Sequence, residues 1–541
     1  MILKENISAQ KLRGAYYTPD ELARLMIRLV CSRDYKCILE PSCGDGVFID
    51  KVMDAHILTD DATITAVEIE PDEAEKVKSR YASSNKVHIN QEDFFDFYER
   101  VLGKENYDLI VGNPPYIRYQ YLTETQREIQ SKILTSHGMK SNKLINAWVA
   151  FLVACVQLLE DDGRIAFVIP AEILQVAYAE DLRLYLANNL SSITLIAFKQ
   201  RVFPEIEQEV LVLIGTKANR KEGIRIIEVA NLAELASLDL QTVGYNSIQH
   251  VKEKWTKYFM TSDEMDVIRQ IRNDYRFSKF ADFGLINVGI TTGNNKYFSV
   301  DKNTVSKYAL DYISKPLIGR SSHAHGIYFT NEDWHKNIEQ GKRAYLVDFP
   351  NIPIEEYPPK HREYIKYGET SGENTGYKCS IRDRWYIVPS VWIPDAFFLR
   401  RNNLYPKFVI NRCEAVSTDT MHRMKFNEGV NPNYVLLSYY NSISFAFTEI
   451  CGRSYGGGVL EILPREMGNI MLPVIEKIDS LLEIELLEYI DSIVRSDDDI
   501  EKALDAVDKK LLITQLRIPV EWCVSCRNIW KKLQRRRLSR S

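Results

Sequence analysis

Short apolar runs alternate with helical patterns over about the first 217 residues of the chain. Helical spacing is clearest near residues 144–160 and 179–188. Alternation of this kind is typical of an α/β fold with a mostly parallel sheet. The last two runs are too close for a crossover helix, so we expect them to pair antiparallel at one edge. The seven predicted strands lie near residues 37–40, 64–69, 87–90, 107–112, 164–169, 193–198 and 210–216.

A helix near the N-terminus has clear start signals in the segment YYTPDELARLMIRLV. Thr18 is the predicted N-cap, Pro19 occupies the first helical position, and Glu21 completes a capping box. Apolar residues then recur at helical spacing, at Leu22, Leu25, Met26 and Leu29.

The pattern changes after about residue 220, where the alternation stops. Helices are predicted at 251–275 and 474–515, and the chain between them is irregular and rich in aromatic residues. We therefore predict domains at 1–245, 246–473 and 474–541. The final segment, RNIWKKLQRRRLSRS, carries no acidic residue, and we expect it to touch DNA nonspecifically or to be disordered.

The composition of the 541-residue chain, 45% hydrophobic and 26% charged, is ordinary for a globular protein. The net charge is −5, so any positive charge that binds nucleic acid must be local. Nine cysteines without disulfide-like spacing indicate a reducing compartment, and we predict a cytoplasmic protein. Cys523 and Cys526 form one CxxC, but no second Cys or His pair lies near it, which disfavours a zinc site.

The longest apolar stretch, LINAWVAFLVACVQLL, contains Asn146 and Gln157 and is too short to cross a bilayer comfortably. We predict a buried helix there, no signal peptide and no membrane partner.

A glycine-containing turn follows the first predicted strand in the segment CILEPSCGDGVFI. Glycines allow close approach of a ligand at the carboxyl end of a strand. The third glycine of a GxGxxG fingerprint would fall at position 49, which is Ile49, so the turn does not indicate NAD.

Acidic residues end the next two predicted strands. Glu68 closes the second strand, where a carboxylate can accept hydrogen bonds from a ribose diol. Asp93 and Phe94 follow the third strand and suit an adenine amino group and ring face. No GxxxxGK[ST] loop is present. The pattern therefore indicates an adenosine-containing cofactor without a pyrophosphate.

The segment VGNPPYIRY, residues 111–119, ends the fourth predicted strand. Two consecutive prolines cannot continue a strand ladder and hold an extended, rigid turn. Asn113 and Tyr116 are thereby presented in a nearly fixed geometry, which suits binding of a flat, polar object.

The ordered motifs GAYYTP, EPSCGDG, VEIEP, EDFF, NPPY and GRIAFVIP resemble those of the gamma-class, TaqI-type N6-adenine DNA methyltransferases. The resemblance covers residue 14 to about 217 and implies a seven-stranded, Rossmann-like domain that binds S-adenosylmethionine. It places Glu68 at the ribose and Asp93 with Phe94 at the adenine. The residues that it places at the methionine part are Thr18, Glu40, Cys43 and Gly44. The implied cofactor residues are Tyr17, Thr18, Glu40, Pro41, Cys43, Gly44, Glu68, Ile69, Asp93, Phe94 and Asn113.

The same resemblance implies that the flat object is an adenine turned out of the duplex. The side-chain carbonyl of Asn113 and the main-chain carbonyl of Pro114, held by Pro115, would accept the two N6 hydrogens. Tyr116 would stack on the base, and Phe203 would supply a second aromatic contact unless it is an ordinary core residue. An asparagine at the first motif position favours adenine over cytosine N4, and the absence of a Pro-Cys dipeptide disfavours cytosine C5.

The C-terminal part resembles the TaqI-like target-recognition domain in NVGITTGNNKYF and GRSYGGGVLEILP. We therefore predict an irregular α+β domain that reads double-stranded DNA, followed by a helical segment. Arginines interleaved with aromatic residues suit contacts to phosphates and base edges. The candidate DNA-binding residues are Arg382, Arg384, Arg400, Arg401 and Arg453.

The function predicted from this resemblance is methylation of adenine N6 at specific DNA sites, by an orphan methylase or the modification enzyme of a restriction-modification system. A separately encoded restriction endonuclease is a candidate partner. Alternatives are a protein glutamine or RNA adenine methyltransferase and a non-catalytic DNA-binding subunit. A fused nuclease before the sheet is disfavoured because the sheet begins almost at residue 14, and no metal is predicted.

Overall fold

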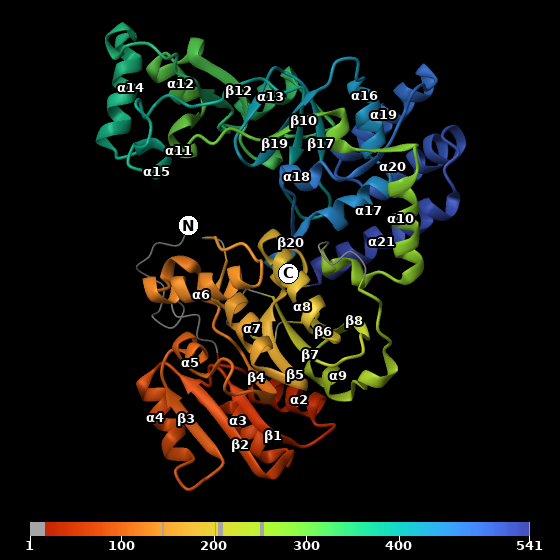
Figure 1. Ribbon diagram of the computed structural model, residues 1–541. Helices are drawn as coiled ribbons and strands as arrows, with labels where there is room; N and C mark the ends of the chain where they lie inside the picture. The colour runs from red at the N-terminus through yellow and green to blue at the C-terminus, as the bar shows by residue number, and fades with distance from the viewer. Residues whose placement is uncertain (1–16, 143–144, 201, 204–208, 249–253, 540–541) are drawn as a thin grey trace. The chain divides into compact units, whose positions relative to one another are not determined.

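The computed structural model describes residues 17–142, 145–200, 202–203, 209–248 and 254–539. These residues form two compact units, which divide between Phe259 and Met260 (Figure 1). Each unit is described by itself below.

One sheet runs through the first unit. Its described strands are β1 (Tyr35–Glu40), β2 (Leu58–Glu68), β3 (Val87–Gln91), β4 (Tyr107–Gly112), β5 (Leu159–Pro170), β6 (Ser192–Phe198), β7 (Val210–Thr216) and β8 (Gly223–Val229). They lie in the order β3-β2-β1-β4-β5-β7-β6-β8. The first five strands are parallel, and β7 runs antiparallel to both β5 and β6. The seven strands predicted from the sequence are therefore all present.

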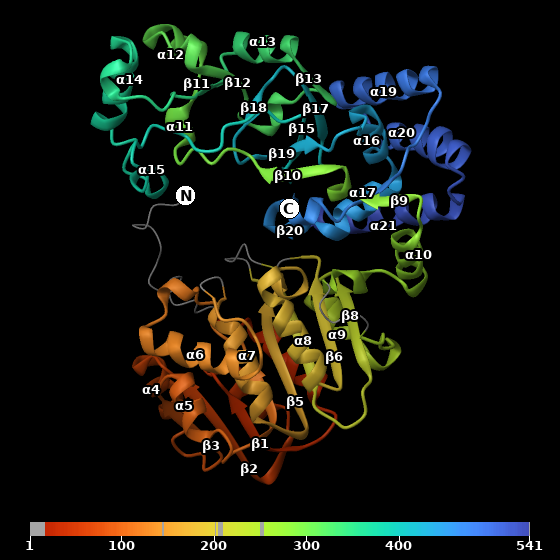
Figure 2. The ribbon, with the colours of Figure 1, turned by 45° about the horizontal axis from the view of Figure 1, so that its top comes forward.

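Helices flank this sheet (Figure 2). One group is formed by α2, which contacts α3 and α9, and another by α7, which contacts α6 and α8. The helices of the first unit are α2 (Asp20–Val30), α3 (Val47–Asp54), α4 (Pro71–Arg80), α5 (Phe94–Val101), α6 (Glu124–Ser136), α7 (Ala147–Leu158), α8 (Glu180–Asn189) and α9 (Leu232–Ser237).

The apolar helix α7 is the longest apolar stretch of the sequence, and every residue in it except Gln157 is buried. The prediction of a buried helix is confirmed. Within the described part of the chain, no helix combines the length and apolarity needed to cross a bilayer.

The predicted start of α2 is wrong by one residue. Pro19 is the N-cap, with φ −54° and ψ 134°, and no side chain caps the helix. Because the ψ of Pro19 is extended, the helix begins at Asp20, and Thr18 lies one residue before the cap position. Glu21 is paired with Arg24 at 2.7 Å and takes no part in a capping box. Asp20 and Glu21 still lie in the first turn, where their negative charges interact favourably with the positive end of the helix dipole.

The sheet has an eighth strand, β8, that the sequence pattern did not predict. It pairs parallel to β6, so the antiparallel pair β6–β7 is confirmed but does not form the edge. Arg225 interrupts the apolar run and made this segment resemble a loop. In the structure Arg225 is buried, bonded to Thr194 and the carbonyl of Val243, with its guanidinium over the ring of Tyr245. A charged side chain can occupy a buried strand position when such distant partners satisfy it.

The first unit extends past the predicted boundary at residue 245. Trp255 is fully buried and Tyr258 is 6% exposed, and both belong to the core of this unit. Instead of one helix over 251–275, the described residues form a 3-10 turn at Trp255–Phe259 and the helix α10 (Ser262–Asn273).

The second unit contains four small sheets. The largest is β10 (Gly284–Val288), β19 (Met421–Phe426), β15 (Ala396–Leu399), β17 (Phe408–Arg412) and β13 (Tyr328–Thr330), in that order. Another is β11 (Ser299–Val300), β14 (Tyr345–Val347), β12 (Ser314–Ile318) and β18 (Val416–Ser417). The smallest are β16 (Arg401–Asn402), β21 (Val459–Glu461) and β20 (Arg453–Tyr455), and the pair β22 (Met471–Pro473) and β9 (Phe277–Lys279).

The helices of the second unit pack beside these sheets (Figure 1). Between the strands lie α11 (Asn295–Phe298), α12 (Lys302–Tyr308), α13 (Asn331–Glu339), α14 (Pro359–Thr370), α15 (Tyr377–Ser380), α16 (Pro432–Tyr439), α17 (Ser442–Cys451) and α18 (Pro464–Met467). After them come α19 (Ser480–Arg495), α20 (Ile500–Val507), a π-helix (Asp508–Gln515) and α21 (Val520–Leu538). The predicted helical segment 474–515 thus begins at Ser480 and is interrupted once, between Arg495 and Ile500, and the π-helix continues α20 directly.

The basic C-terminal segment is a packed helix through Leu538, so the expected disorder is wrong for these residues, whereas nonspecific contact with DNA stays a prediction. Helix α21 contacts α17 and buries Trp522, Cys526 and Trp530 in the core of the second unit that also contains residues of β15, β17 and β19. Arg537 is 1% exposed and pairs with the buried carboxylate of Glu449 at 2.7 Å. Its guanidinium also donates to the carbonyl of Gly458. This basic segment therefore contains structural cations, since Arg527 likewise pairs with the buried carboxylate of Asp508 at 3.3 Å.

Replacing Arg537 by Ala is expected to lower the free energy of unfolding by about 3–5 kcal/mol, because the substitution leaves the Glu449 carboxylate buried without its counter-charge. Arg535→Ala is the matched control, since Arg535 lies exposed on the same helix. Urea denaturation of the full chain measures the free energy of unfolding of both variants. Equal stability of the two variants would contradict a structural role for Arg537.

Candidate active site

The carboxyl ends of four parallel strands bring most of the predicted site residues to one edge of the sheet. Strand β1 ends at Glu40, β2 at Glu68 and β4 at Gly112. Register pairs Glu40 with Ala66 in β2, and Leu39 with Ile110 in β4. Parallel α/β sheets bind ligands at this edge.

The carboxylate of Glu68 holds the glycine turn against β2. It accepts hydrogen bonds from the amides of Gly44 at 2.7 Å and Glu70 at 2.8 Å. Gly44 and Gly46 have φ values of +50° and +83°, which glycine adopts without a steric penalty. Glu68 is thus oriented before any ligand arrives, and Ile69, the next residue, is 53% exposed.

Tyr17 covers the glycine turn. A Cβ atom at Gly44 would lie 3.4 Å from Cε1 of Tyr17, so the ring rests directly on the backbone. Partial burial and the neighbouring Glu73 raise the pKa of the Tyr17 hydroxyl. Thr18 beside it is buried. Tyr17 is therefore packed on the turn, and the positive φ of Gly44 is the feature of this turn that favours glycine.

Glu40 is the least solvated acid at this edge. It is 2% exposed, and its Oε2 has no hydrogen-bond partner among the described residues. Burial, reinforced by Asp45 and Glu68, raises the pKa of its carboxyl well above the usual range. A positively charged ligand at this edge would supply the missing counter-charge.

Pro41 and Cys43 are buried next to Glu40. Burial and the nearby carboxylates raise the pKa of the Cys43 thiol far above its usual range. A thiol that stays protonated is a poor nucleophile, so Cys43 contributes packing and backbone position to this edge.

Asp93 and Phe94 lie where β3 leads into α5. Asp93 is the N-cap of α5, and its Oδ1 accepts a hydrogen bond from the amide of Phe95 at 2.7 Å. Phe94 is 3% exposed and stacks on Phe151 with ring centroids 4.4 Å apart. The ring of Phe94, which the sequence analysis predicted to contact an adenine, therefore packs mainly in the core.

Gln126 is a residue of this site that the sequence analysis missed. Its Nε2 donates to Oδ2 of Asp93 at 2.7 Å. The pattern of Thr123 followed three residues later by Gln126 indicates a capping box, and that box is present at the start of α6. Nothing in the spacing relates Gln126 to Asp93.

The segment from Asn113 to Tyr116 leaves β4 beside the glycine turn. A Cβ atom at Gly112 would lie 3.4 Å from Cδ of Pro41 and 3.9 Å from Cγ of Glu40. The hydroxyl of Ser42 donates to the main-chain carbonyl of Asn113 at 3.4 Å. The two predicted halves of the site, glycine turn and proline segment, are therefore in contact.

The aromatic residues predicted to stack on a base are mostly buried. Tyr116 is 9% exposed and Phe203 is 7% exposed, and both belong to the core of the first unit. Pro114 is also buried, while Pro115 is partly exposed. Residues 201 and 204–208, which flank Phe203, lie outside the described residues. The stacking roles stay predictions.

Comparison with known protein families bears on this edge directly. A model of the N-6 DNA methylase family matches residues 1–288, and that match spans both the glycine turn and the Asn-Pro-Pro-Tyr segment. The chain belongs to the N-6 DNA methylase family. A second model, the C-terminal domain of the type II methyltransferase M.Eco57I, matches residues 252–512.

Curated relatives of this methylase are type II methyltransferases. The chain is 22% identical over 510 residues to M.AccI of Acinetobacter calcoaceticus, covering 89% of each protein. It is 25% identical over 379 residues to M.HindII of Haemophilus influenzae, covering 65% of this chain and 69% of the relative. Among solved structures, the type IIL restriction-modification enzyme MmeI in complex with DNA is similar in fold. Its TM-score is 0.54 and its identity 12%, over 96% of this chain and 75% of that one.

Three of the arginines predicted to bind DNA are held by buried carboxylates of the second unit. Arg400 and Arg401 each lie 3.0 Å from Glu461, which is 4% exposed. Arg453 pairs with Glu466 at 2.7 Å. Only Arg401 keeps an exposed side chain among these, at 69%. These cations therefore join residues 400–401 to β21 and β20 to α18, and their DNA contacts stay predictions.

Arg382 and Arg384 bind main-chain carbonyls. Arg382 donates to Thr291 at 3.2 Å and to Trp385 at 3.3 Å, and Arg384 donates to Ile352 at 2.7 Å. These bonds order the loop that carries both arginines and leave their readout of DNA untested.

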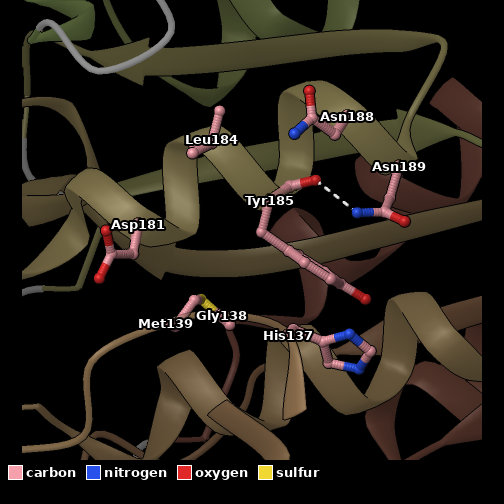
Figure 3. A pocket seen from close by; sticks show the side chains of 8 residues that line it. All are labelled: His137, Gly138, Met139, Asp181, Leu184, Tyr185, Asn188 and Asn189. Carbon is pink, nitrogen blue, oxygen red and sulfur yellow. Dashed lines mark hydrogen bonds between the residues drawn. The ribbon is translucent and has the colours of Figure 1, made fainter. Parts of the chain in front are cut away.

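A cavity of about 180 Å³ lies elsewhere in the first unit (Figure 3). Helix α8 supplies one wall, and the segment that follows α6 supplies the other. Its lining residues are His137, Gly138, Met139, Asp181, Leu184, Tyr185, Asn188 and Asn189. None of them is a predicted site residue of the methylase, so this cavity is separate from the edge described above.

No cluster of three metal-ligating side chains occurs in the part of the chain that the structure describes. Cys523 and Cys526 are both buried on α21.

Proposed function

We propose that this N6-adenine DNA methyltransferase transfers a methyl group from S-adenosylmethionine to a flipped adenine within a specific duplex sequence. The observation that carries the proposal is the contact between the glycine turn and the Asn113 segment. This contact joins a cluster of oriented acids to a rigid pair of carbonyl acceptors at one strand edge. The chain would act as the modification enzyme of a restriction-modification system, with a separately encoded endonuclease as candidate partner.

The acid cluster fits the proposed cofactor. S-Adenosylmethionine carries an ammonium and a sulfonium group, and Glu40 offers a buried carboxylate oxygen without a partner. Glu68 would hold the ribose, Tyr17 and Gly44 would line the methionine part, and Asp93 would accept from the adenine amino group. When bound, the cofactor supplies the methyl group.

Asn113 and Pro114 would orient the target amine. Two carbonyl groups that accept the N6 hydrogens would direct the nitrogen lone pair toward the methyl group of the cofactor. They would act through their position and their fixed dipoles. Cys43 is buried and its thiol pKa is raised, so the chain places no ionised thiol at this edge and direct transfer is favoured. Tyr116 and Phe203 would stack on the flipped base, which requires both rings to become more exposed than they are in this structure.

The second unit would choose the DNA sequence. It carries the match to the M.Eco57I C-terminal domain over residues 252–512, and its exposed Arg401 is a candidate for contact with double-stranded DNA.

The decisive experiment incubates the purified chain with labelled S-adenosylmethionine and duplex DNA, and digests the product to nucleosides. Label in N6-methyladenine supports the proposal. Label in N4-methylcytosine, in protein glutamine or in RNA alone would refute it, as would the absence of any transfer. Sequencing of modified bases in DNA from expressing cells identifies the recognition site.

Cofactor affinity should depend on pH through Glu40. Because burial raises the pKa of this carboxyl in the free protein, a cationic ligand that selects the carboxylate must displace a proton. The dissociation constant for S-adenosylmethionine should therefore fall as pH rises through the raised pKa. Glu40→Gln should weaken binding and flatten this pH dependence.

Calorimetry in buffers of different ionisation enthalpy measures the released proton directly. Glu75→Gln on α4 is the control, because Glu75 is exposed. Unchanged affinity and unchanged proton release in Glu40→Gln would contradict the assignment of Glu40.

A further inference from the structure

Gln126 connects the carboxylate of Asp93 to the chain that follows the Asn113–Tyr116 segment. Its Nε2 donates to Oδ2 of Asp93 at 2.7 Å, and its Oε1 accepts from the amide of Thr123 at 2.9 Å. Both ends of the side-chain amide are therefore occupied, so its orientation is determined by the bonds themselves.

Asp93 is restrained from two sides. Oδ1 accepts from the amide of Phe95 in the first turn of α5, and Oδ2 accepts from Gln126 in the first turn of α6. One bond at each oxygen sets the plane of the carboxylate. Each oxygen keeps a second lone pair, so the group can still accept a hydrogen bond from a ligand.

The segment between Tyr116 and Thr123 is tied to the same helix. Arg127 of α6 donates to the carbonyl of Tyr119 at 3.1 Å and stacks over its ring at 5.1 Å. The carbonyl of Ile117 accepts from the amide of Ala147, where α7 begins, at 2.9 Å. The first residues of α6 thus bind both the chain after the proline segment, through Arg127, and Asp93, through Gln126.

We propose that Gln126 is a positioning residue for the adenine end of the cofactor. It orients the Asp93 carboxylate toward the 6-amino group and couples that end to residues 117–123. The inference rests on the proposed function, because it requires a bound adenosyl group. Hydrogen bonds to ionised carboxylates are short and strong, so losing this donor should change affinity measurably.

The test measures binding of S-adenosylhomocysteine to the full chain by calorimetry. Gln126→Leu keeps the side-chain length approximately and removes the donor, and we expect about a tenfold rise in the dissociation constant. Thr123→Ala is the matched control. It removes the other half of the capping box, in which Thr123 Oγ1 accepts from the amide of Gln126, and leaves the Asp93 bond in place. Its affinity should stay near that of the unchanged protein.

A second ligand separates positioning from general damage. The inosine counterpart of S-adenosylhomocysteine carries a 6-oxo group, which cannot donate to Asp93. The unchanged protein should prefer the 6-amino ligand, and Gln126→Leu should lose most of that preference. Equal weakening for both ligands would indicate a merely structural role and overturn the inference.

Gln126→Glu keeps the acceptor for Thr123 and serves if the leucine variant does not fold. At pH 8 the introduced carboxylate cannot donate to Asp93 and repels it, so affinity should fall below that of the unchanged protein measured at the same pH. Wild-type affinity at every pH would overturn the inference. If the unchanged protein binds neither ligand, the cofactor assignment fails and this inference fails with it.

Discussion

Asn113→Ala is expected to reduce the rate of methyl transfer by at least about 10²–10³-fold, the range found when one oriented polar group is removed from a reacting centre. The side-chain carbonyl of Asn113 is one of the two proposed acceptors for the target N6 hydrogens. Without it the amine loses its orientation, and the Pro114 carbonyl alone does not direct the lone pair. Single-turnover assays with labelled S-adenosylmethionine measure the chemical step.

Binding separates this effect from general damage to the site. Cofactor affinity of Asn113→Ala should stay close to that of the unchanged protein, because the acids that contact the cofactor are left in place. Asn188→Ala, an exposed asparagine on α8, is the control and should keep full activity. A variant at Asn113 that keeps the original rate would remove Asn113 from the mechanism.

A fragment ending at Phe259 should bind cofactor but lose specific DNA binding by about 10³-fold or more, the usual ratio of specific to nonspecific affinity. The reason is that the second unit, which begins at Met260, carries the proposed DNA-reading surface. Gel-shift titration against the recognition sequence and a scrambled duplex measures the ratio. Site-specific methylation by the fragment would refute the assignment of sequence recognition to the second unit.

The end point of that fragment matters. A cut at residue 245 removes Trp255 and Tyr258, which are 0% and 6% exposed in the first core. Losing a buried tryptophan costs about 3–5 kcal/mol, so the shorter fragment should unfold at a lower urea concentration and bind cofactor poorly. Comparing the two fragments tests whether the first unit is complete at Phe259.

Much of the first unit could be predicted from local patterns. Strand and helix periods, two glycines with positive φ and two consecutive prolines are local signals, and they placed seven strands and the ends that carry Glu68 and Asn113 correctly. Strand β8 was missed because Arg225 interrupts its apolar run. The charge is satisfied by Thr194 and the carbonyl of Val243, which no window of sequence joins to it.

The candidate site divides in the same way. The sequence by itself named the residue types at each strand end and their order, and so indicated the acids, the glycine turn and the proline segment. Only the tertiary structure decided which of these side chains are buried and which partners they have. It buried Phe94 against Phe151, left Oε2 of Glu40 without a partner, and joined Gln126 to Asp93 across 33 residues.

Charged residues of the C-terminal helix show why the sequence alone does not decide which charges are buried. The sequence determined a basic, helix-compatible segment, but Arg537 and its exposed neighbour Arg535 look alike there. The structure assigned Arg537 to the core because Glu449, 88 residues earlier, is buried beside it. Backbone conformation depends mainly on neighbours in sequence, whereas desolvation and pairing of a charge depend on whichever groups the fold brings within a few ångströms.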